Sequence, residues 1–75
     1  MTPLDQHVGR RIRGKRRALG LAQDDLAAEL GVGRDTIEAY ERATARVPSA
    51  HLIRLAAFLG VSVAYFFPAT SRPGA

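Results

Sequence analysis

The residues of this sequence with the clearest chemical capacity are arginines, and their spacing favours the binding of anions. Six basic residues lie between Arg10 and Arg17, and other arginines stand at Arg34, Arg42 and Arg46. A guanidinium donates two parallel hydrogen bonds to paired acceptors, such as phosphate oxygens or guanine O6 and N7. These residues suit a polyanionic partner, although a basic run on a helix is usually a solvated face.

Catalysis and metal binding have no comparable support. The chain contains no cysteine, and its two histidines, His7 and His51, stand alone without ligand spacing. A glycine-rich phosphate loop is also missing. Asp24 and Asp25 are adjacent, so a helix would turn their side chains about 100° apart and they would not converge on one atom. We expect no enzyme activity, no metal and no cofactor.

Length and composition predict one small basic domain. The chain has 75 residues, a formal net charge of +4, a pI of about 10.7 and 47% hydrophobic residues. That hydrophobic fraction suffices for a folded core and argues against disorder. No apolar run approaches the roughly 18 residues that span a bilayer, and the N-terminus lacks an apolar signal region. The default expectation is a cytoplasmic, nucleoid-associated protein without a membrane partner.

The first helix has clear boundary signals. Thr2, Pro3 and Asp5 predict a helix start, since threonine can cap, proline is tolerated in the first turn and a carboxylate suits the positive helix end. We expect the helix to run to about Leu19 and to stop at Gly20. Its predicted apolar stripe consists of Leu4, Val8, Ile12 and Leu19.

Residues 22–42 predict two short helices joined by a tight turn. The first helix would begin near Gln23 and stop at Gly31, and the second would start after Gly33 and run through Arg42. A glycine-bearing turn of this length between two short helices is typical of a helix-turn-helix. The apolar positions that would pack the motif together are Leu26, Ala27, Leu30, Val32, Ile37 and Tyr40.

The C-terminal part predicts a fourth helix and a short fifth one. Pro48 and Ser49 would open the fourth helix, with Ser49 as its cap, and Gly60 would end it. The apolar segment 63–67, capped by Ser62, is too short for more than one or two turns. A buried strand is the rival interpretation there, but the chain offers no partner strand.

The chain resembles the phage repressor and Cro type of helix-turn-helix regulator, the xenobiotic-response-element family, in the stretches VGRRIR, LGLAQDDLAAELGVGRDTIEAYE and LIRLAAFLGVSVAYFF. The resemblance covers roughly residues 8–67. The VGRRIR opening, the YER…RVP…A-x-L stretch and the YFF ending resemble a bacterial subgroup of small stand-alone regulators. It implies an all-α, lambda-repressor-like fold. We expect a single domain of about five short helices over residues 4–68, with residues 69–75 as a disordered tail.

The resemblance also implies which residues meet DNA bases. In the family the second helix of the motif lies in the major groove, with its N-terminal residues at base edges. By position, these residues are Arg34, Asp35, Thr36 and Ala39. Arg34 could bind guanine, Asp35 could accept from cytosine N4 or orient Arg34, and Ala39 could touch a thymine methyl. The alternative for each is a solvated surface residue.

Phosphate contacts are implied in the same way. The family places a glutamine at the start of the motif, where it binds a backbone phosphate and braces the recognition helix, and Gln23 holds that position. Such contacts position the protein on double-stranded DNA without reading its sequence. The other residues expected at phosphates are Gly33, Arg42, Arg46, Arg10 and Arg13.

Two charged residues fall on faces that should be buried. Arg16 lies on the apolar stripe of the first helix, and Glu41 lies one turn past Ile37. A buried charge must be paired, and the family joins these two positions in an inter-helix ion pair. We expect an Arg16–Glu41 pair that sets the angle between the first helix and the recognition helix.

The sequence departs from the family pattern in two places. Ala22 and Gly33 stand where the motif helices usually carry a Ser or Thr cap. The loop RATARV, after Glu41, lacks the common glycine. The first departure bears on the residue at which each motif helix begins. The second bears on whether Arg42 and Arg46 contact phosphate as the family pattern implies.

Proteins of this type usually bind DNA as twofold dimers, with half-sites about 34 Å apart. The apolar C-terminal segment is the expected dimer contact, and its residues are Val63, Tyr65, Phe66 and Phe67. The alternative is that these side chains close the core of the monomer. The sequence does not sort the aromatics between the two roles.

The leading functional hypothesis is a dimeric, sequence-specific DNA-binding regulator, a repressor or autoregulator that recognises an inverted repeat. The competing hypothesis is a protein-interaction module, antitoxin-like or polymerase-docking, in which DNA binding is secondary. No site for a small-molecule effector is evident.

Overall fold

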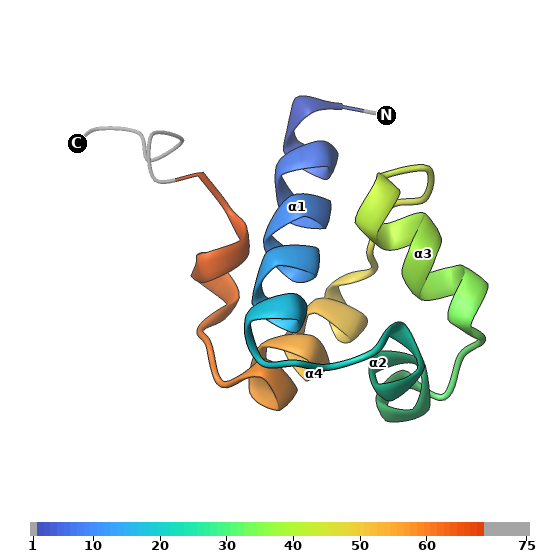
Figure 1. Ribbon diagram of the computed structural model, residues 1–75. Coiled ribbons are helices and arrows are strands. Elements are labelled where there is room, and N and C mark those ends of the chain that lie inside the picture. The colour runs from blue at the N-terminus through green and yellow to red at the C-terminus, as the bar shows by residue number, and fades with distance from the viewer. Residues whose placement is uncertain (1, 69–75) are drawn as a thin grey trace.

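The structure is a computed structural model that describes residues 2–68, and it consists of helices joined by short connections (Figure 1). Their order is α1 (Pro3–Ala18), α2 (Gln23–Leu30), α3 (Arg34–Arg42), α4 (Ser49–Leu59) and the 3₁₀ helix η1 (Val63–Phe66). No strand occurs within the described residues. The prediction of an all-α fold is therefore confirmed, and the rival strand at 63–67 is not formed. The predicted tail, residues 69–75, lies outside the described residues.

The start of α1 has the predicted cap. The Asp5 amide donates a hydrogen bond to Thr2 Oγ1 at 3.1 Å, and the Thr2 amide donates to the Asp5 carboxylate at 3.2 Å. Pro3 occupies the first helical position, where no amide donor is needed. The helix ends at Ala18, and Gly20 follows in the left-handed conformation with a φ of 72°.

The apolar stripe predicted for α1 is buried only at its centre. Val8 and Ile12 belong to the core, whereas Leu4 and Leu19 are 45% and 48% exposed. The prediction is wrong for these two leucines because each lies at an end of the helix. Leu19 follows the last helical residue, and Leu4 lies in the first turn at the rim of a groove.

α2 and α3 form the predicted helix-turn-helix. Gly31 ends α2 with a φ of 69°, a conformation that favours glycine. The Val32 amide then donates to the Ala27 carbonyl at 3.0 Å, which closes the turn. The residues that the two helices bury are Leu26, Ala27, Leu30, Ile37, Tyr40 and Glu41.

Neither helix of the motif has a side-chain cap at its N-terminus, as the residues at Ala22 and Gly33 predict. At α2 the helix itself compensates in part, because the Asp25 carboxylate accepts a hydrogen bond from the Ala22 amide at 2.8 Å. At α3 the Asp35 carboxylate lies over the Gly33 backbone, since a Cβ on Gly33 would stand 2.6 Å from Asp35 Oδ1. Acidic residues in the first turn of each helix also suit the positive end of the helix dipole.

The loop after α3 begins with a non-glycine residue in the left-handed conformation. Ala43 has a φ of 62° and is 2% exposed. The Thr44 amide donates to the Ala39 carbonyl at 2.9 Å, which ends α3 as a glycine turn would. The missing glycine therefore leaves the turn itself in place, at a conformational cost of about 1–2 kcal/mol.

α4 starts one residue earlier than its predicted cap implies. Pro48 is the N-cap, and its carbonyl accepts a hydrogen bond from the Leu52 amide at 3.0 Å. Ser49 is therefore the first helical residue, and the prediction that it caps the helix is wrong. Gly60 ends α4 with a φ of 74°, as predicted.

α1 and α3 approach each other most closely at Gly9. A Cβ at this position would stand 2.6 Å from the Tyr40 carbonyl oxygen and 2.7 Å from that of Glu41. No real Cβ atom fits at such distances, so the helices touch backbone to backbone. Gly9 therefore sets how near α3 lies to α1.

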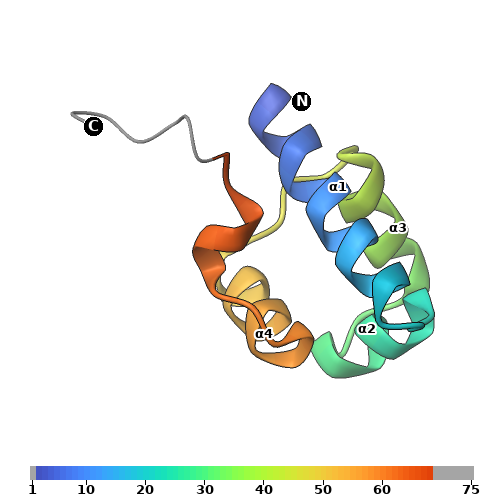
Figure 2. The same ribbon diagram turned by 60° about the vertical axis from the view of Figure 1, so that its left-hand side comes forward.

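The core draws on every helical element. The largest fully buried side chains are Phe66, Ile12, Leu26, Ile37 and Leu55, which come from η1, α1, α2, α3 and α4 in turn. Figure 2 shows η1 close to α1 and α4, on the side of the molecule away from α3. The short fifth helix thus completes the core that positions the helix-turn-helix.

Candidate nucleic-acid interface

The first residue of α3 is an exposed arginine that is held by the first residue of α2. Arg34 Nε donates a hydrogen bond to Gln23 Oε1 at 3.3 Å. Within residues 2–68 the two terminal nitrogens of Arg34 have no partner, so they remain free to donate together. Gln23 therefore braces the start of the recognition helix.

Gln23 is linked in turn to the predicted charged pair. Its Nε2 donates to Glu41 Oε1 at 3.1 Å. Arg16 Nε donates to Glu41 Oε2 at 2.6 Å, and Arg16 Nη2 donates to Glu41 Oε1 at 3.1 Å. The side chains of Arg16 and Glu41 are 12% and 3% exposed, so the pair is well covered. The structure thus brings together the two residues that the sequence predicted to pair.

The third arm of Arg16 reaches the connection between α1 and α2. Arg16 Nη1 donates to the Leu21 carbonyl at 2.8 Å. The guanidinium therefore bonds α3 and the α1–α2 connection at once, and the Gln23 bond to Glu41 adds the start of α2. This network fixes the N-terminus of the motif relative to α1.

The other predicted base-reading residues lie on the same helix with different exposure. Asp35 is exposed, whereas Thr36 and Ala39 are half-buried. The Thr36 amide donates to the Gly33 carbonyl at 3.1 Å. The start of α3 therefore presents Arg34 and Asp35 most fully, with Thr36 and Ala39 beside them.

A polar hollow of about 170 Å³ lies between α1 and the motif. Its lining residues are Arg13, Arg16, Gln23, Glu38, Glu41 and Arg42. Three of the predicted phosphate ligands, Arg13, Gln23 and Arg42, thus meet around one space although they come from three helices. Glu38 was missed by the sequence analysis, and its spacing of one helical turn from Arg42 is the signal that was available. The two side chains form an exposed pair at 3.4 Å.

The remaining predicted phosphate ligands lie in different settings. Arg10 is exposed on α1, and its side chain has no hydrogen bond or ion pair within residues 2–68. Arg46 instead pairs with Asp5, its Nε and Nη2 donating to the two carboxylate oxygens at 3.1 and 3.2 Å. Hydrogen bonding from Arg46, aided by Thr2, lowers the pKa of Asp5 below its usual range. Sequence analysis did not anticipate this pair.

The four residues predicted for the dimer contact do not share one environment. Phe66 is fully buried in the core, so the prediction that it contacts a second copy is wrong. Val63, Tyr65 and Phe67 are half-buried and pack against the core from outside. The Arg11 guanidinium stacks over the Tyr65 ring at 4.6 Å from its centroid. These three residues keep surface that a partner could cover.

His51 has a structural partner. Tyr40 Oη and His51 Nδ1 lie 2.9 Å apart, which ties α3 to α4. Within the described residues, no group of three or more acidic or histidine side chains could hold a metal ion. None of the helices described is both long and apolar enough to cross a membrane.

A family model described as helix-turn-helix matches residues 12–66, which include the whole motif, α4, η1 and the second part of α1. The chain belongs to the helix-turn-helix family. The match includes α2 and α3 entire, so the hollow and the Arg16–Glu41 pair are features of a helix-turn-helix domain.

Relatives of this helix-turn-helix chain are named as regulators. It is 42% identical over 65 residues to an uncharacterized HTH-type transcriptional regulator of Sinorhizobium medicae, a match that covers 87% of this chain and 47% of that protein. It is 41% identical over 69 residues to an uncharacterized transcriptional regulator in the ATPase CF(0) region of Rhodospirillum rubrum, covering 92% of this chain and 64% of that protein. The chain thus spans about half to two thirds of the length of these relatives.

Solved structures of regulators share the fold. The restriction-modification controller protein C.AhdI of Aeromonas hydrophila is 30% identical with a TM-score of 0.78, over 84% of this chain and 96% of that one. The P22 c2 repressor, crystallised with a synthetic operator, is 30% identical with a TM-score of 0.74, over 80% of this chain and 91% of that one. The predicted lambda-repressor-like fold is therefore confirmed.

Proposed function

We propose that this helix-turn-helix protein is a sequence-specific DNA-binding transcriptional regulator whose α3 enters the major groove. The observation that carries the proposal is the exposed start of α3, where Arg34 is braced by Gln23 and the helix is tied to α1 through Glu41. A recognition helix must be rigidly placed, because each base contact depends on donor geometry. The naming of the relatives and the operator bound to the P22 c2 repressor support the same role.

Base reading falls mainly to Arg34. Its Nε is taken by Gln23, and its Nη atoms are the pair that would donate to guanine O6 and N7. Asp35 would accept from cytosine N4 or orient Arg34. Thr36 and Ala39 are half-buried and would make smaller contacts, with Ala39 limited to a thymine methyl.

Phosphate binding would centre on the polar hollow. Gln23 Nε2 uses one hydrogen on Glu41 and has a second hydrogen for a phosphate. Arg13 and Arg42 flank it, while Arg10 on α1 and the Gly33 backbone would extend the contact along the DNA strand. Glu38 opposes phosphate on charge grounds and would orient Arg42 instead. Arg46, in the loop after α3, is held by Asp5.

The protein would act as a homodimer on an inverted repeat, as a repressor or autoregulator. One recognition helix covers few base pairs, and a twofold dimer would place two such helices about 34 Å apart. Val63, Tyr65 and Phe67 are the proposed contact because all three belong to the C-terminal apolar segment and are only partly buried. Such a regulator would work in the cytoplasm at the nucleoid.

The deciding experiment is selection of bound sequences from random DNA by the 75-residue chain, followed by gel shifts with the selected site. We expect an enriched half-site, and we expect Arg34→Ala to lower affinity for that site by about 1–3 kcal/mol while relaxing preference at one base pair. Arg54→Ala is the matched control, because it removes the same exposed side chain from α4.

The outcomes separate the two functional classes. Equal loss of preference with Arg54→Ala would exclude base reading by Arg34. If no sequence is enriched and no DNA is retained at low salt, the protein-interaction hypothesis replaces the DNA-binding one.

A further inference from the structure

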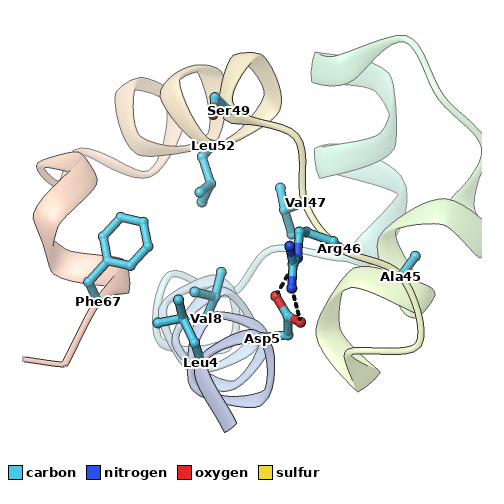
Figure 3. Close-up of a pocket in the computed structure, with 9 residues that line it drawn as sticks. All are labelled: Leu4, Asp5, Val8, Ala45, Arg46, Val47, Ser49, Leu52 and Phe67. Carbon is cyan, nitrogen blue, oxygen red and sulfur yellow. Dashed lines mark hydrogen bonds and ion pairs between the residues drawn. The ribbon is translucent and has the colours of Figure 1, made fainter. Parts of the chain in front are cut away.

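An ion pair joins the first turn of α1 to the loop between α3 and α4 (residues 43–48). Arg46 Nε and Nη2 donate to Asp5 Oδ1 and Oδ2 at 3.1 and 3.2 Å, across 41 positions of sequence. Figure 3 shows the two side chains facing each other at the rim of the apolar groove that Leu4, Val47 and Phe67 help to line. The loop that follows the recognition helix is therefore tied to the start of the chain.

The carboxylate of Asp5 is fully engaged by this arrangement. Besides Arg46, it accepts hydrogen bonds from the Thr2 amide at 3.2 Å and from Thr2 Oγ1 at 2.9 Å. Its side chain is only 13% exposed. Three of these four donors reach Oδ2 and one reaches Oδ1, so most of the hydrogen-bonding capacity of the Asp5 carboxylate is used inside the protein.

Arg46 is the opposite case. Its side chain is 71% exposed, and its Nη1 has no partner within residues 2–68. A guanidinium carries five N–H donors in a rigid plane, so two that bind a carboxylate leave a second edge for another planar or tetrahedral anion. That edge faces solvent from the loop directly after α3.

The backbone of this loop is also held at its other end. Ala43 adopts a φ of 62°, and Thr44 donates to the Ala39 carbonyl through its amide at 2.9 Å and its hydroxyl at 3.3 Å. With Thr44 tied to α3 and Arg46 tied to α1, the loop has two anchors. The free edge of Arg46 thus has a defined position relative to the recognition helix.

We propose that Asp5 is a positioning residue, which holds Arg46 so that the free edge of its guanidinium binds a DNA backbone phosphate. This inference rests on the proposed function. In this proposal an acidic residue favours the binding of a polyanion. The expected change in DNA affinity on removing Asp5 is therefore opposite in sign to the change expected from net charge alone. Removal of a negative charge near DNA should tighten binding through general electrostatics, whereas removal of Asp5 should weaken it.

The experiment measures affinity of the full chain for its selected DNA site over a series of salt concentrations. The variants are Asp5→Asn, Arg46→Ala and the double variant. We expect Arg46→Ala to weaken binding about tenfold and to lower the slope of log K against log salt by about 0.9, the value for one lost phosphate contact. Asp5→Asn should weaken binding about fivefold. In the Arg46→Ala background, Asp5→Asn should weaken it no further, because Asp5 acts through Arg46.

Two control variants separate positioning from charge and from stability. Asp24→Asn removes an exposed carboxylate that has no hydrogen bond or ion pair within residues 2–68, and it should leave affinity unchanged or raise it. Thr2→Ala removes the hydroxyl that caps α1 but leaves the Arg46 pair, and it should lower the melting temperature while affinity stays within about twofold. All affinities are measured well below the lowest melting temperature, as followed by circular dichroism.

Three results would overturn the inference. The first is that Asp5→Asn tightens DNA binding, as Asp24→Asn does. The second is that Asp5→Asn weakens binding equally with and without Arg46. The third is that Thr2→Ala lowers DNA affinity as much as Asp5→Asn does. Failure of the proposed function gives a different result from failure of this inference, because the unmodified chain would then select no DNA site at all.

Discussion

Glu41 joins α3 to both α1 and α2. It accepts hydrogen bonds from Arg16 on α1 and from Gln23 at the start of α2, and its own side chain is 3% exposed. A covered ion pair adds little net stability over an apolar pair, but loss of one partner leaves the other charge without compensation. The residue therefore acts more on the geometry of the fold than on its total free energy.

Removal of Glu41 alone should be severe. We expect Glu41→Ala to lower the free energy of unfolding by about 3–5 kcal/mol, because Arg16 would remain covered and unpaired. Urea denaturation measures this change. Glu38→Ala is the control, since it breaks an exposed pair with Arg42 and should change the free energy by less than about 1 kcal/mol. Equal effects of the two variants would contradict the structural role assigned to Glu41.

At the scale of elements, the contact between α1 and α3 is decided by the absence of a side chain. Gly9 lets the α1 backbone touch the carbonyl oxygens of Tyr40 and Glu41. Glycine in a helix interior destabilises the helix by roughly 0.5–1 kcal/mol relative to alanine. The close packing of the two helices outweighs that cost.

A pair of glycine substitutions on the same helix tests this packing. Gly9→Ala should reduce the free energy of unfolding by about 1–3 kcal/mol or more, since the new Cβ must push α3 away from α1. Gly14→Ala should increase it by about 0.5–1 kcal/mol, because nothing lies within 4 Å of the added Cβ. Thermal melts of both variants measure these changes in the free energy of unfolding. Stabilisation by Gly9→Ala would show that the helices are not in backbone contact.

At the scale of the whole molecule, η1 closes the core with one aromatic residue and leaves others at the surface. Phe66 is fully buried and belongs to the monomer. The rings of Tyr65 and Phe66 meet edge to face, at 5.7 Å between centroids, and the Arg11 guanidinium lies over the Tyr65 ring. A surface next to the core is thus available for the proposed dimer.

Substitutions at neighbouring positions should separate folding from association. Phe66→Ala should destabilise the monomer by about 3–5 kcal/mol. Tyr65→Ala should leave the fold intact and raise the dimer dissociation constant at least about tenfold, because interface aromatics carry much of the binding energy. Sedimentation velocity measures the association. Ile53→Ser, on the 59% exposed residue of α4, is the control and should not change it; dissociation by this variant instead would place the contact on α4.

The helices of this protein were readable from the sequence because their boundaries depend on neighbours a few positions away. Thr2, Pro3 and Asp5 start α1, and Gly31 and Gly60 end α2 and α4, each through bonds within one or two turns. Apolar spacing likewise identified the buried residues of the motif. The Arg16–Glu41 contact was accessible only because the chain resembles a family that has it.

Tertiary structure alone decided the features that join distant positions. It exposed Leu4, buried Phe66 and paired Asp5 with Arg46, and no local pattern distinguishes these residues from others of their kind. The physical reason is that exposure and pairing depend on which elements meet, and a bond across 41 positions forms only after α1, α3 and α4 have packed. The sequence by itself determined the helices and the motif, whereas the packed molecule determined which arginines are paired and which keep free donors.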